Sequence, residues 1–497
     1  MAHTPRIFTI PASAPFLPTL IEALVDGTLV PGFGRSVDPL ALASATIYLP
    51  TRRACRLARG MFLDVSGTAA AILPRLIAIG DVDEDEIAFA QAAESEADLP
   101  EALELPEALG PLERRLLLGR LVLAFAAQIN PRHPGETPLI ANHPATALAL
   151  ADDLARLIDD MTTRGVSWDR LDDLVPDHLD TLWQLTLAFL KIARTAWPDI
   201  LAERGLVEAA ARRDALIKAE AARLARVGGP VIAAGSTGSI PATAALIAAV
   251  AKLPHGAVVL PGLDTDLDEE SWKLIAAPPS GLAGAATSQQ QSGWVTPAAG
   301  HPQFALQALL RRLEMTRDAV VPLGQRAARG RERLTSEAFR PAGSTDQWRT
   351  RTLASEFVLH AEAALKGLAF VEAANAEEEA LAIAVALREA TEDPDKTAAL
   401  VTPDREIARR VLAALARWNV AVEDSGGVDL GDTLPGVFAR LAAQAAIEGL
   451  PPVGLLALLK HPLSRLATRE DAQAQSVAAL ERAILRGPRP RPPARSL

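Results

Sequence analysis

Residues 45–59 read ATIYLPTRRACRLAR and contain, side by side, the two kinds of element from which the fold is built. The apolar run Ala45–Leu49 predicts a short buried strand, which ends at Pro50. Thr51 is a suitable N-cap for a helix that continues to about Leu63. A strand followed directly by a helix is the repeating unit of open, parallel α/β sheets.

The same alternation occurs on both sides of this stretch. Apolar runs bounded by Gly or Pro predict further strands at 6–10, 76–79, 230–234 and 257–260. Helical periodicity predicts helices at 16–25 and 243–252. The last two strands and the helix between them form a βαβ unit that most simply rejoins the first sheet. We therefore predict one parallel α/β domain formed by residues 1–100 and 226–280.

The rest of the chain predicts three further parts. Residues 101–225 show only helical periodicity, with candidate helices at 112–128, 146–162, 179–197 and 208–224, and we interpret them as an all-helical insertion in the first domain. Residues 281–355 predict a linker followed by a basic helical segment. Residues 356–497 predict a second α/β domain with a Pro/Arg-rich tail, with strands at 369–373, 398–402 and 420–422 and helices at 377–391 and 404–418.

Composition excludes several classes of protein. The single cysteine, Cys55, excludes a disulfide framework, a zinc ribbon and a four-cysteine iron–sulfur site built from this chain alone, and it fits a reducing cytoplasm. No stretch approaches about 18 consecutive apolar residues, so no transmembrane helix and no membrane partner are expected. Since the net charge is −11, any contact with nucleic acid must use local basic patches.

Two α/β regions with a helical insertion in the first are the layout of a nucleotide motor, but the residues that bind nucleotide phosphates are missing. A P-loop needs glycines, then a lysine, then Ser or Thr. No lysine follows a glycine anywhere in the sequence, and the loop Pro11–Pro15 reads PASAP, in which two prolines remove two backbone donors. We expect no ATP turnover, and an ATP-binding enzyme with a non-standard P-loop is the alternative.

No metal or cofactor site is predicted either. The eight histidines lack the spacing of metal ligands, and the strand that ends at Ala234 is not followed by a carboxylate. The alternative magnesium ligands are Asp81 and Asp83, in the acidic run 81–86, where a solvated loop is the competing interpretation.

Two basic segments are candidates for phosphate contact. Arg52, Arg56 and Arg59 are spaced to share one helix face, with Thr51 and Arg53 beside them, and this helix start predicts contact with a DNA backbone. A solvated face or ion pairs within the protein are the alternatives. The second segment contains Arg326, Arg329, Arg331 and Arg333 and is interpreted as mobile and charged, with DNA contact as the alternative.

A glycine-containing loop is the third candidate for anion binding. Gly235, Ser236 and Thr237 follow a predicted strand, and the backbone amides of such a loop can surround a phosphate. A tight turn between strand and helix is the alternative.

Seven stretches of the sequence resemble the AddB family of DNA double-strand break repair subunits, in its alphaproteobacterial type. They occur in the family's order along nearly the whole chain: 6–11, 48–54, 80–85, 234–241, 260–264, 398–405 and 486–490. The resemblance implies two RecA-like domains of the superfamily-1 helicase type, with the helical insertion in the first. It covers the N-terminal half of the family's usual length, so the second domain, 356–497, is expected to be incomplete.

The resemblance also implies a function. AddB pairs with an AddA-like subunit in a cytoplasmic, ATP-dependent helicase–nuclease that resects double-strand ends for homologous recombination, and its helicase-like half is not the motor. The family's nuclease motif, its magnesium and its iron–sulfur cluster would belong to the C-terminal half. We therefore expect a catalytically silent, DNA-binding scaffold that contacts DNA ends or single strands around Thr51, Arg52 and Arg53. A protein-interaction module without DNA binding is the alternative.

Overall fold

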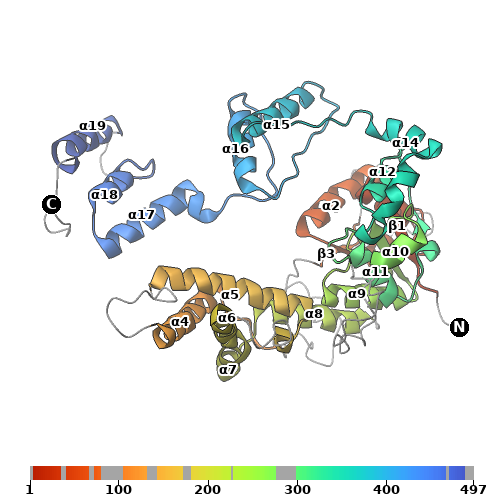
Figure 1. The fold of residues 1–497 in the computed structure, drawn as a ribbon, viewed down its shortest axis with the longest axis horizontal. Helices are drawn as coiled ribbons and strands as arrows, with labels where there is room; N and C mark the ends of the chain where they lie inside the picture. The colour runs from red at the N-terminus through yellow and green to blue at the C-terminus, as the bar shows by residue number, and fades with distance from the viewer. Residues whose placement is uncertain are drawn as a thin grey trace. The chain divides into compact units, whose positions relative to one another are not determined.

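The computed structural model describes residues 4–34, 41–66, 72–79, 105–130, 143–171, 181–224, 228–275, 298–465 and 470–486. The chain divides into two compact units, Met1–Gly367 and Leu368–Leu497 (Figure 1). Three predicted features lie outside the described residues: the acidic run 81–86, most of the linker that begins at 281, and the Pro/Arg-rich tail after Arg486.

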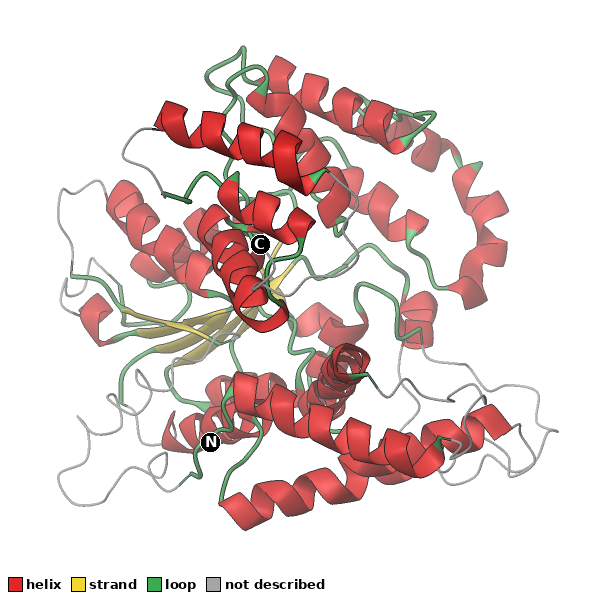
Figure 2. Ribbon diagram, turned by 90° about the vertical axis from the view of Figure 1, so that its left-hand side faces the viewer, coloured by secondary structure: helices red, strands yellow, loops and turns green. Residues whose placement is uncertain are grey.

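The described residues of the first unit form one parallel sheet of six strands in the order β3-β2-β4-β5-β1-β6 (Figure 2). This confirms the predicted parallel α/β sheet and the return of the βαβ unit to it. The strands are β1 (Ile7–Ile10), β2 (Thr46–Leu49), β3 (Arg75–Ala78), β4 (Val231–Ala234), β5 (Gly256–Pro261) and β6 (Val321–Pro322). The edge strand β6 was not predicted, because two residues are too short to show an alternating pattern.

Both faces of the sheet are buried because successive side chains of each strand point to opposite sides. In β2, Tyr48 belongs to one core while Ile47 and Leu49 belong to the other. Helices α1 (Phe16–Val25) and α2 (Arg52–Ser66) pack against the Ile47 face. The opposite face is covered by α8 (Ala209–Arg223), α9 (Pro241–Lys252), α10 (Glu269–Ile275) and α11 (Phe304–Arg312).

The helices predicted between β3 and β4 are present and have a core of their own. This core contains Leu118, Leu154 and Trp197. The helices are α4 (Pro111–Ile129), α5 (Pro144–Arg164), α6 (Thr181–Lys191) and α7 (Trp197–Arg204), followed by α8. The single helix predicted at 179–197 is interrupted by a π-helical turn, η4 (Ile192–Ala196), from which α7 continues.

The second unit contains the predicted helices but not the predicted strands. Helices α15 (Ala376–Ala390) and α16 (Arg405–Ala416) pack through a small core, and α17 (Leu434–Glu448), α18 (Pro452–Leu459) and α19 (Glu470–Leu480) follow. Within the described part of this unit, none of the segments 369–373, 398–402 and 420–422 pairs as a strand. Phe370 and Val401 are 90% and 93% exposed, so these two side chains lie in solvent. Leu400 and Val420 are partly buried, but they pack against the core of α15 and α16 and not within a sheet.

Tyr48, the only tyrosine, joins the sheet to α8, because its hydroxyl donates a hydrogen bond to the buried carboxylate of Glu220. Arg223 holds the same carboxylate through two hydrogen bonds of 2.8 Å. Burial and the charge of Glu220 raise the pKa of Tyr48 well above its ordinary value of 10.0. Burial alone would raise the pKa of Glu220, but the hydrogen bonds from Arg223 and Tyr48 outweigh it and lower that pKa.

Tyr48 is expected to remain protonated in the folded chain when ordinary tyrosines have ionised. Because the folded-state pKa is raised, this hydroxyl contributes stability that is complete below the ordinary pKa of about 10 and is lost as the pH rises through the folded value. Ultraviolet absorbance at increasing pH measures the single tyrosinate directly, with Tyr48→Phe as the blank. Ionisation near pH 10 while circular dichroism still shows folded chain would contradict the buried pair.

Candidate functional site

The carboxyl ends of parallel strands meet at one edge of a sheet, which is where open α/β folds bind ligands. Two cavities open at this edge. The first, of about 580 Å³, lies between the loops after β1 and β5 and helix α12 (Arg331–Ala338), and we call it the arginine cavity. The second, of about 410 Å³, is apolar and is lined by Phe16, Pro50 and Gly235 among others. The two cavities share Pro11, Ala12 and Gly262.

Helix α2 begins at the same edge, directly after β2. The Thr51 hydroxyl accepts a hydrogen bond from the Ala54 amide at 3.1 Å, which confirms the predicted N-cap. Cys55 and Ala58 are buried against the sheet, so the opposite face carries four exposed arginines: Arg52, Arg53, Arg56 and Arg59. We call them the α2 arginines.

The partners of the α2 arginines differ along the helix. Arg56 and Arg59 form no ion pair or hydrogen bond with the part of the chain that the structure describes, whereas Arg52 and Arg53 do have interactions. The prediction of a shared arginine face is therefore confirmed. The alternative of internal ion pairing does not account for Arg56 and Arg59.

The loop after β4 forms a tight turn. Gly235 and Gly238 have φ values of +78° and +66°, a region that favours glycine. The Gly235 amide donates to the Val259 carbonyl at 2.9 Å, and the Gly238 amide donates to the Ser236 hydroxyl at 3.3 Å. These donors are used inside the protein, which favours the turn interpretation of Gly235, Ser236 and Thr237 over a phosphate cradle.

The loop between β1 and α1 binds a carboxylate of the protein itself, that of Glu332. The amide and the hydroxyl of Ser13 both donate to one carboxylate oxygen of Glu332, at 2.9 and 2.7 Å. The Ala327 amide donates to the Ser13 hydroxyl at 2.9 Å. In a P-loop protein, the loop after the first strand binds a phosphate. In this chain the corresponding loop binds the Glu332 carboxylate of α12.

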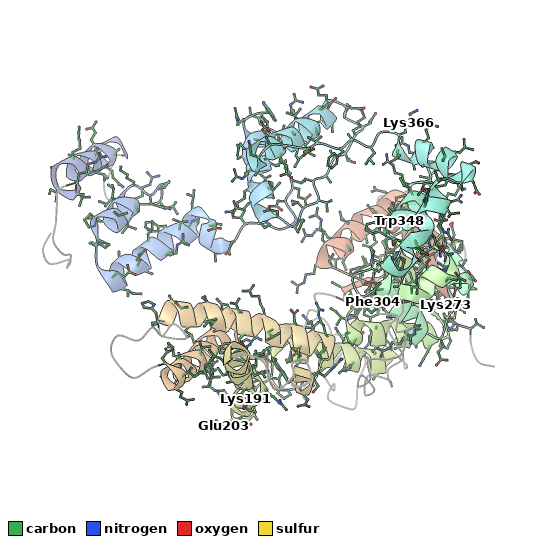
Figure 3. All side chains as sticks on the ribbon, viewed as in Figure 1. Lys191, Glu203, Lys273, Phe304, Trp348 and Lys366 are labelled. Carbon is green, nitrogen blue, oxygen red and sulfur yellow. The ribbon has the colours of Figure 1, made fainter. Side chains whose placement is uncertain are left out.

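Three of the four arginines in the second basic segment have partners within the protein. Arg326 makes a two-pronged contact with Asp266 at 2.9 and 3.0 Å. Arg331 donates to the carbonyls of Ala364 and Lys366, where α14 (Ser355–Leu365) ends. Figure 3 labels Lys366. Arg333 pairs with Glu356 at 2.8 Å. Of the four arginines, Arg329 alone has no partner among the described residues, and it lines the arginine cavity.

His301 and Gln303 also line the arginine cavity. The Gln303 side chain donates to the Gly262 carbonyl at 3.0 Å and accepts from the Asp264 amide at 3.1 Å. Nδ1 of His301 accepts from the Gln303 amide at 3.1 Å. Burial lowers the pKa of His301, opposed by the Phe339 backbone and the Asp264 carboxylate. Because Nδ1 already accepts a hydrogen bond, the neutral ring carries its proton on the buried Nε2 and can donate it to the Phe339 backbone.

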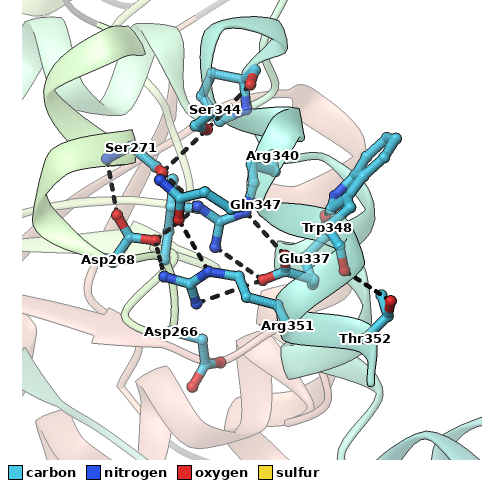
Figure 4. Close-up of polar contacts among 12 residues, drawn as sticks. Asp266, Asp268, Ser271, Glu337, Arg340, Ser344, Gln347, Trp348, Arg351 and Thr352 are labelled. Atoms are coloured by element: carbon cyan, nitrogen blue, oxygen red, sulfur yellow. Dashed lines mark hydrogen bonds and ion pairs between the residues drawn. The ribbon is translucent and has the colours of Figure 1, made fainter. Parts of the chain in front are cut away.

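A buried ionic network holds α12 in place beside the cavity (Figure 4). The Asp268 carboxylate accepts from the Ser271 amide at 2.9 Å and from Arg340 and Arg351 at 2.7 Å each. Arg340 also makes two hydrogen bonds to Glu337, at 2.9 and 2.8 Å. The network thus joins the start of α10 to the end of α12, whose residues line the cavity.

Sequence reasoning found the α2 arginines but missed Ser13, Glu332, His301 and Gln303 as parts of one site. No local pattern links Ser13 to Glu332, which lies 319 residues later. Among the described residues, no group of three or more His, Cys, Asp or Glu side chains is placed to hold a metal ion. The described helices also include none that combines the length and the hydropathy of a bilayer span.

Comparison with known proteins adds no assignment: no family model matches the chain, and no curated protein matches it significantly in sequence.

Proposed function

We propose that this chain binds DNA through the α2 arginines, as the non-motor, helicase-like part of an AddB-type subunit in double-strand break repair. The observation that carries the proposal is the position of Arg56 and Arg59, which are exposed and have no partner among the described residues, on a helix that starts at the ligand-binding edge of the sheet. Guanidinium groups near a helix start attract phosphates by charge, and the helix dipole adds to that attraction. Such a patch gives an acidic protein a local site for a DNA backbone.

The motor itself would be supplied by a partner subunit. No lysine follows a glycine in this chain, and the loop after β1 holds the Glu332 carboxylate, so its donors are already used. We propose an AddA-like, ATP-hydrolysing partner in the cytoplasm, with β1–β6 as the sheet of a first RecA-like domain and α4–α8 as its helical insertion. Turnover of ATP by the purified chain, unchanged in Ser13→Ala, would count against this assignment.

The DNA contact is tested by replacing Arg56 and Arg59 together with glutamine. Each phosphate contact to a single strand contributes about 0.7 to the slope of log affinity against log salt. The double variant is expected to lower that slope by about 1.4 and to weaken binding roughly tenfold at moderate salt. Fluorescence anisotropy with a labelled single-stranded oligonucleotide, from about 50 to 200 mM salt, measures both quantities.

The matched control is Arg409→Gln with Arg410→Gln on α16. These arginines are exposed but paired with Glu406 and Glu377, and the double variant changes the net charge by the same amount. We expect it to bind like the unmodified chain. If both double variants lose the same affinity, the effect is one of net charge and the α2 site is excluded. If the unmodified chain does not bind at about 50 mM salt, the protein-interaction alternative is favoured.

A further inference from the structure

The arginine cavity has the volume and the lining of a site for a small anion. Its volume of about 580 Å³ lies within the usual range of small-molecule pockets, roughly 300–1,000 Å³. Three arginines and three carboxylates line it, so their formal charges cancel: Arg326, Arg329, Arg331, Asp264, Asp266 and Glu332. Asp266 already neutralises Arg326, and Asp264 accepts from the amides of Asp266 and Leu267.

Glu332 occupies the best anion position in this cavity. Its carboxylate accepts hydrogen bonds from both the amide and the hydroxyl of Ser13. Donor sets of this type bind carboxylate or phosphate. The carboxylate is 3.6 Å from Nε of Arg326, so a cation remains beside it if Ser13 is released. Its side chain is 18% exposed, which leaves it accessible from the cavity.

One further group of the cavity has donors to offer. Arg329 is exposed and forms no hydrogen bond or ion pair with the described residues. Phe339 lies at the same cavity and is 53% exposed, which offers an apolar surface to the rest of a ligand.

We propose that the arginine cavity is a binding site for a phosphate ester, whose phosphate takes the place of the Glu332 carboxylate at Ser13. In the bound state Ser13 donates to the phosphate and Arg329 pairs with it. Glu332 moves toward Arg326. The Glu332 carboxylate therefore competes for the Ser13 donors, and an anion that binds weakly does not displace it. The inference does not depend on DNA contact at the α2 arginines, because no α2 arginine lines this cavity.

The decisive variant is Glu332→Gln, which removes one negative charge and leaves the lining with a net charge of +1. We expect pyrophosphate, measured by isothermal titration calorimetry at constant ionic strength, to bind at least about tenfold more tightly than to the unmodified chain. Adding Arg329→Gln to this variant should abolish the gain. Glu356→Gln is the matched control, because it removes an exposed carboxylate paired with Arg333 outside the cavity, and it should change nothing.

The phosphate ester could be a free nucleotide or the end of a DNA strand, and two oligonucleotides separate these sources. In Glu332→Gln, a 5′-phosphorylated oligonucleotide that binds more tightly than its 5′-hydroxyl counterpart identifies a strand end. Equal binding of the two, with tight pyrophosphate binding, identifies a free nucleotide. The two oligonucleotides differ only in the 5′ group, so any binding at the α2 arginines contributes equally to both affinities. The difference between the affinities therefore tests the arginine cavity independently of the proposed DNA contact.

The proposal is overturned if Glu332→Gln does not bind pyrophosphate, or if Arg329→Gln leaves the gain intact. If Glu332→Gln does not fold, as judged by circular dichroism, Glu332→Asp is the second variant. It keeps the charge near Arg326 but shortens the side chain, so Ser13 is released. It should then show a smaller gain in the same direction, and no gain would overturn the proposal equally.

Discussion

Replacing Arg340 with methionine is expected to lower the free energy of unfolding of the first unit by about 3–5 kcal/mol. The Arg340 side chain is 1% exposed and pairs with both Asp268 and Glu337. Methionine fills much of the same volume, but it leaves two carboxylates facing a buried space with only Arg351 to neutralise them. Breaking a buried ion pair from one side is costly because the remaining charge is already desolvated.

Arg333→Met is the matched control for this prediction. Arg333 lies on the same helix, but its side chain is 42% exposed and pairs with Glu356 at the surface. Solvent screens such exposed pairs, so this one is expected to contribute little to stability. Hydrogen exchange measured by mass spectrometry locates the effect, and α10, α12 and α13 (Trp348–Thr352) should lose protection in Arg340→Met but not in Arg333→Met. Equal effects of the two variants would show that the network contributes no more than a surface pair.

The same network should make stability depend on pH at the acidic end. Burial alone would raise the pKa of Asp268, but the hydrogen bonds from Ser271 and Arg340 outweigh it and hold that pKa well below 3.8. The folded value is therefore lower than the unfolded one. This carboxylate contributes stability above pH 3.8 and loses it as the pH falls through the folded value. In Arg340→Met the acid transition should be less steep, which urea unfolding at a series of pH values measures.

The parts of this fold that the sequence predicts are those encoded locally. The strand Thr46–Leu49 and the Thr51 cap follow from an apolar run, a proline and a hydroxyl within a few residues. The arginine face of α2 follows from helical spacing alone. The strand predictions of the second unit failed because pairing in a sheet is not encoded locally. An apolar run can predict an extended segment, but it cannot supply the neighbouring strand whose amides and carbonyls must pair with it.

The arginine cavity was not predictable because its contacts join distant parts of the chain. Arg326 and Arg331 stand in a run of like charges, which favours a solvated, mobile interpretation. Their acceptors come from residue 266 and from the end of α14, and neither is recognisable as a partner from spacing. The same holds for Ser13, since a serine between prolines gives no sign that a glutamate from a distant helix will bind it.

Trp197→Ala is expected to destabilise the helices α4–α7 by about 3–5 kcal/mol. The indole is 1% exposed at the centre of their core, and its Nε1–H donates to the buried Glu208. Glu208 is also 3.0 Å from Nε of Arg114, whose guanidinium binds Asp159 on α5 at 2.9 Å. Loss of the indole therefore leaves both a cavity and a buried carboxylate with one donor fewer. The loss of protection should appear by hydrogen exchange in α4, α5 and α7.

A second substitution separates these two contributions. Trp197→Phe keeps an aromatic ring in the core and removes the N–H, so it should cost about 1–3 kcal/mol, the penalty for an unsatisfied buried acceptor plus a smaller cavity. Trp418→Ala, at a residue that is 40% exposed, is the control and should cost far less. If Trp197→Phe lowers the stability as much as Trp197→Ala does, the hydrogen bond to Glu208, and not the packing of the indole, accounts for the contribution of Trp197. The π-helical turn η4 would then serve to direct the indole N–H at that carboxylate, because the extra residue in such a turn changes where the following side chain points.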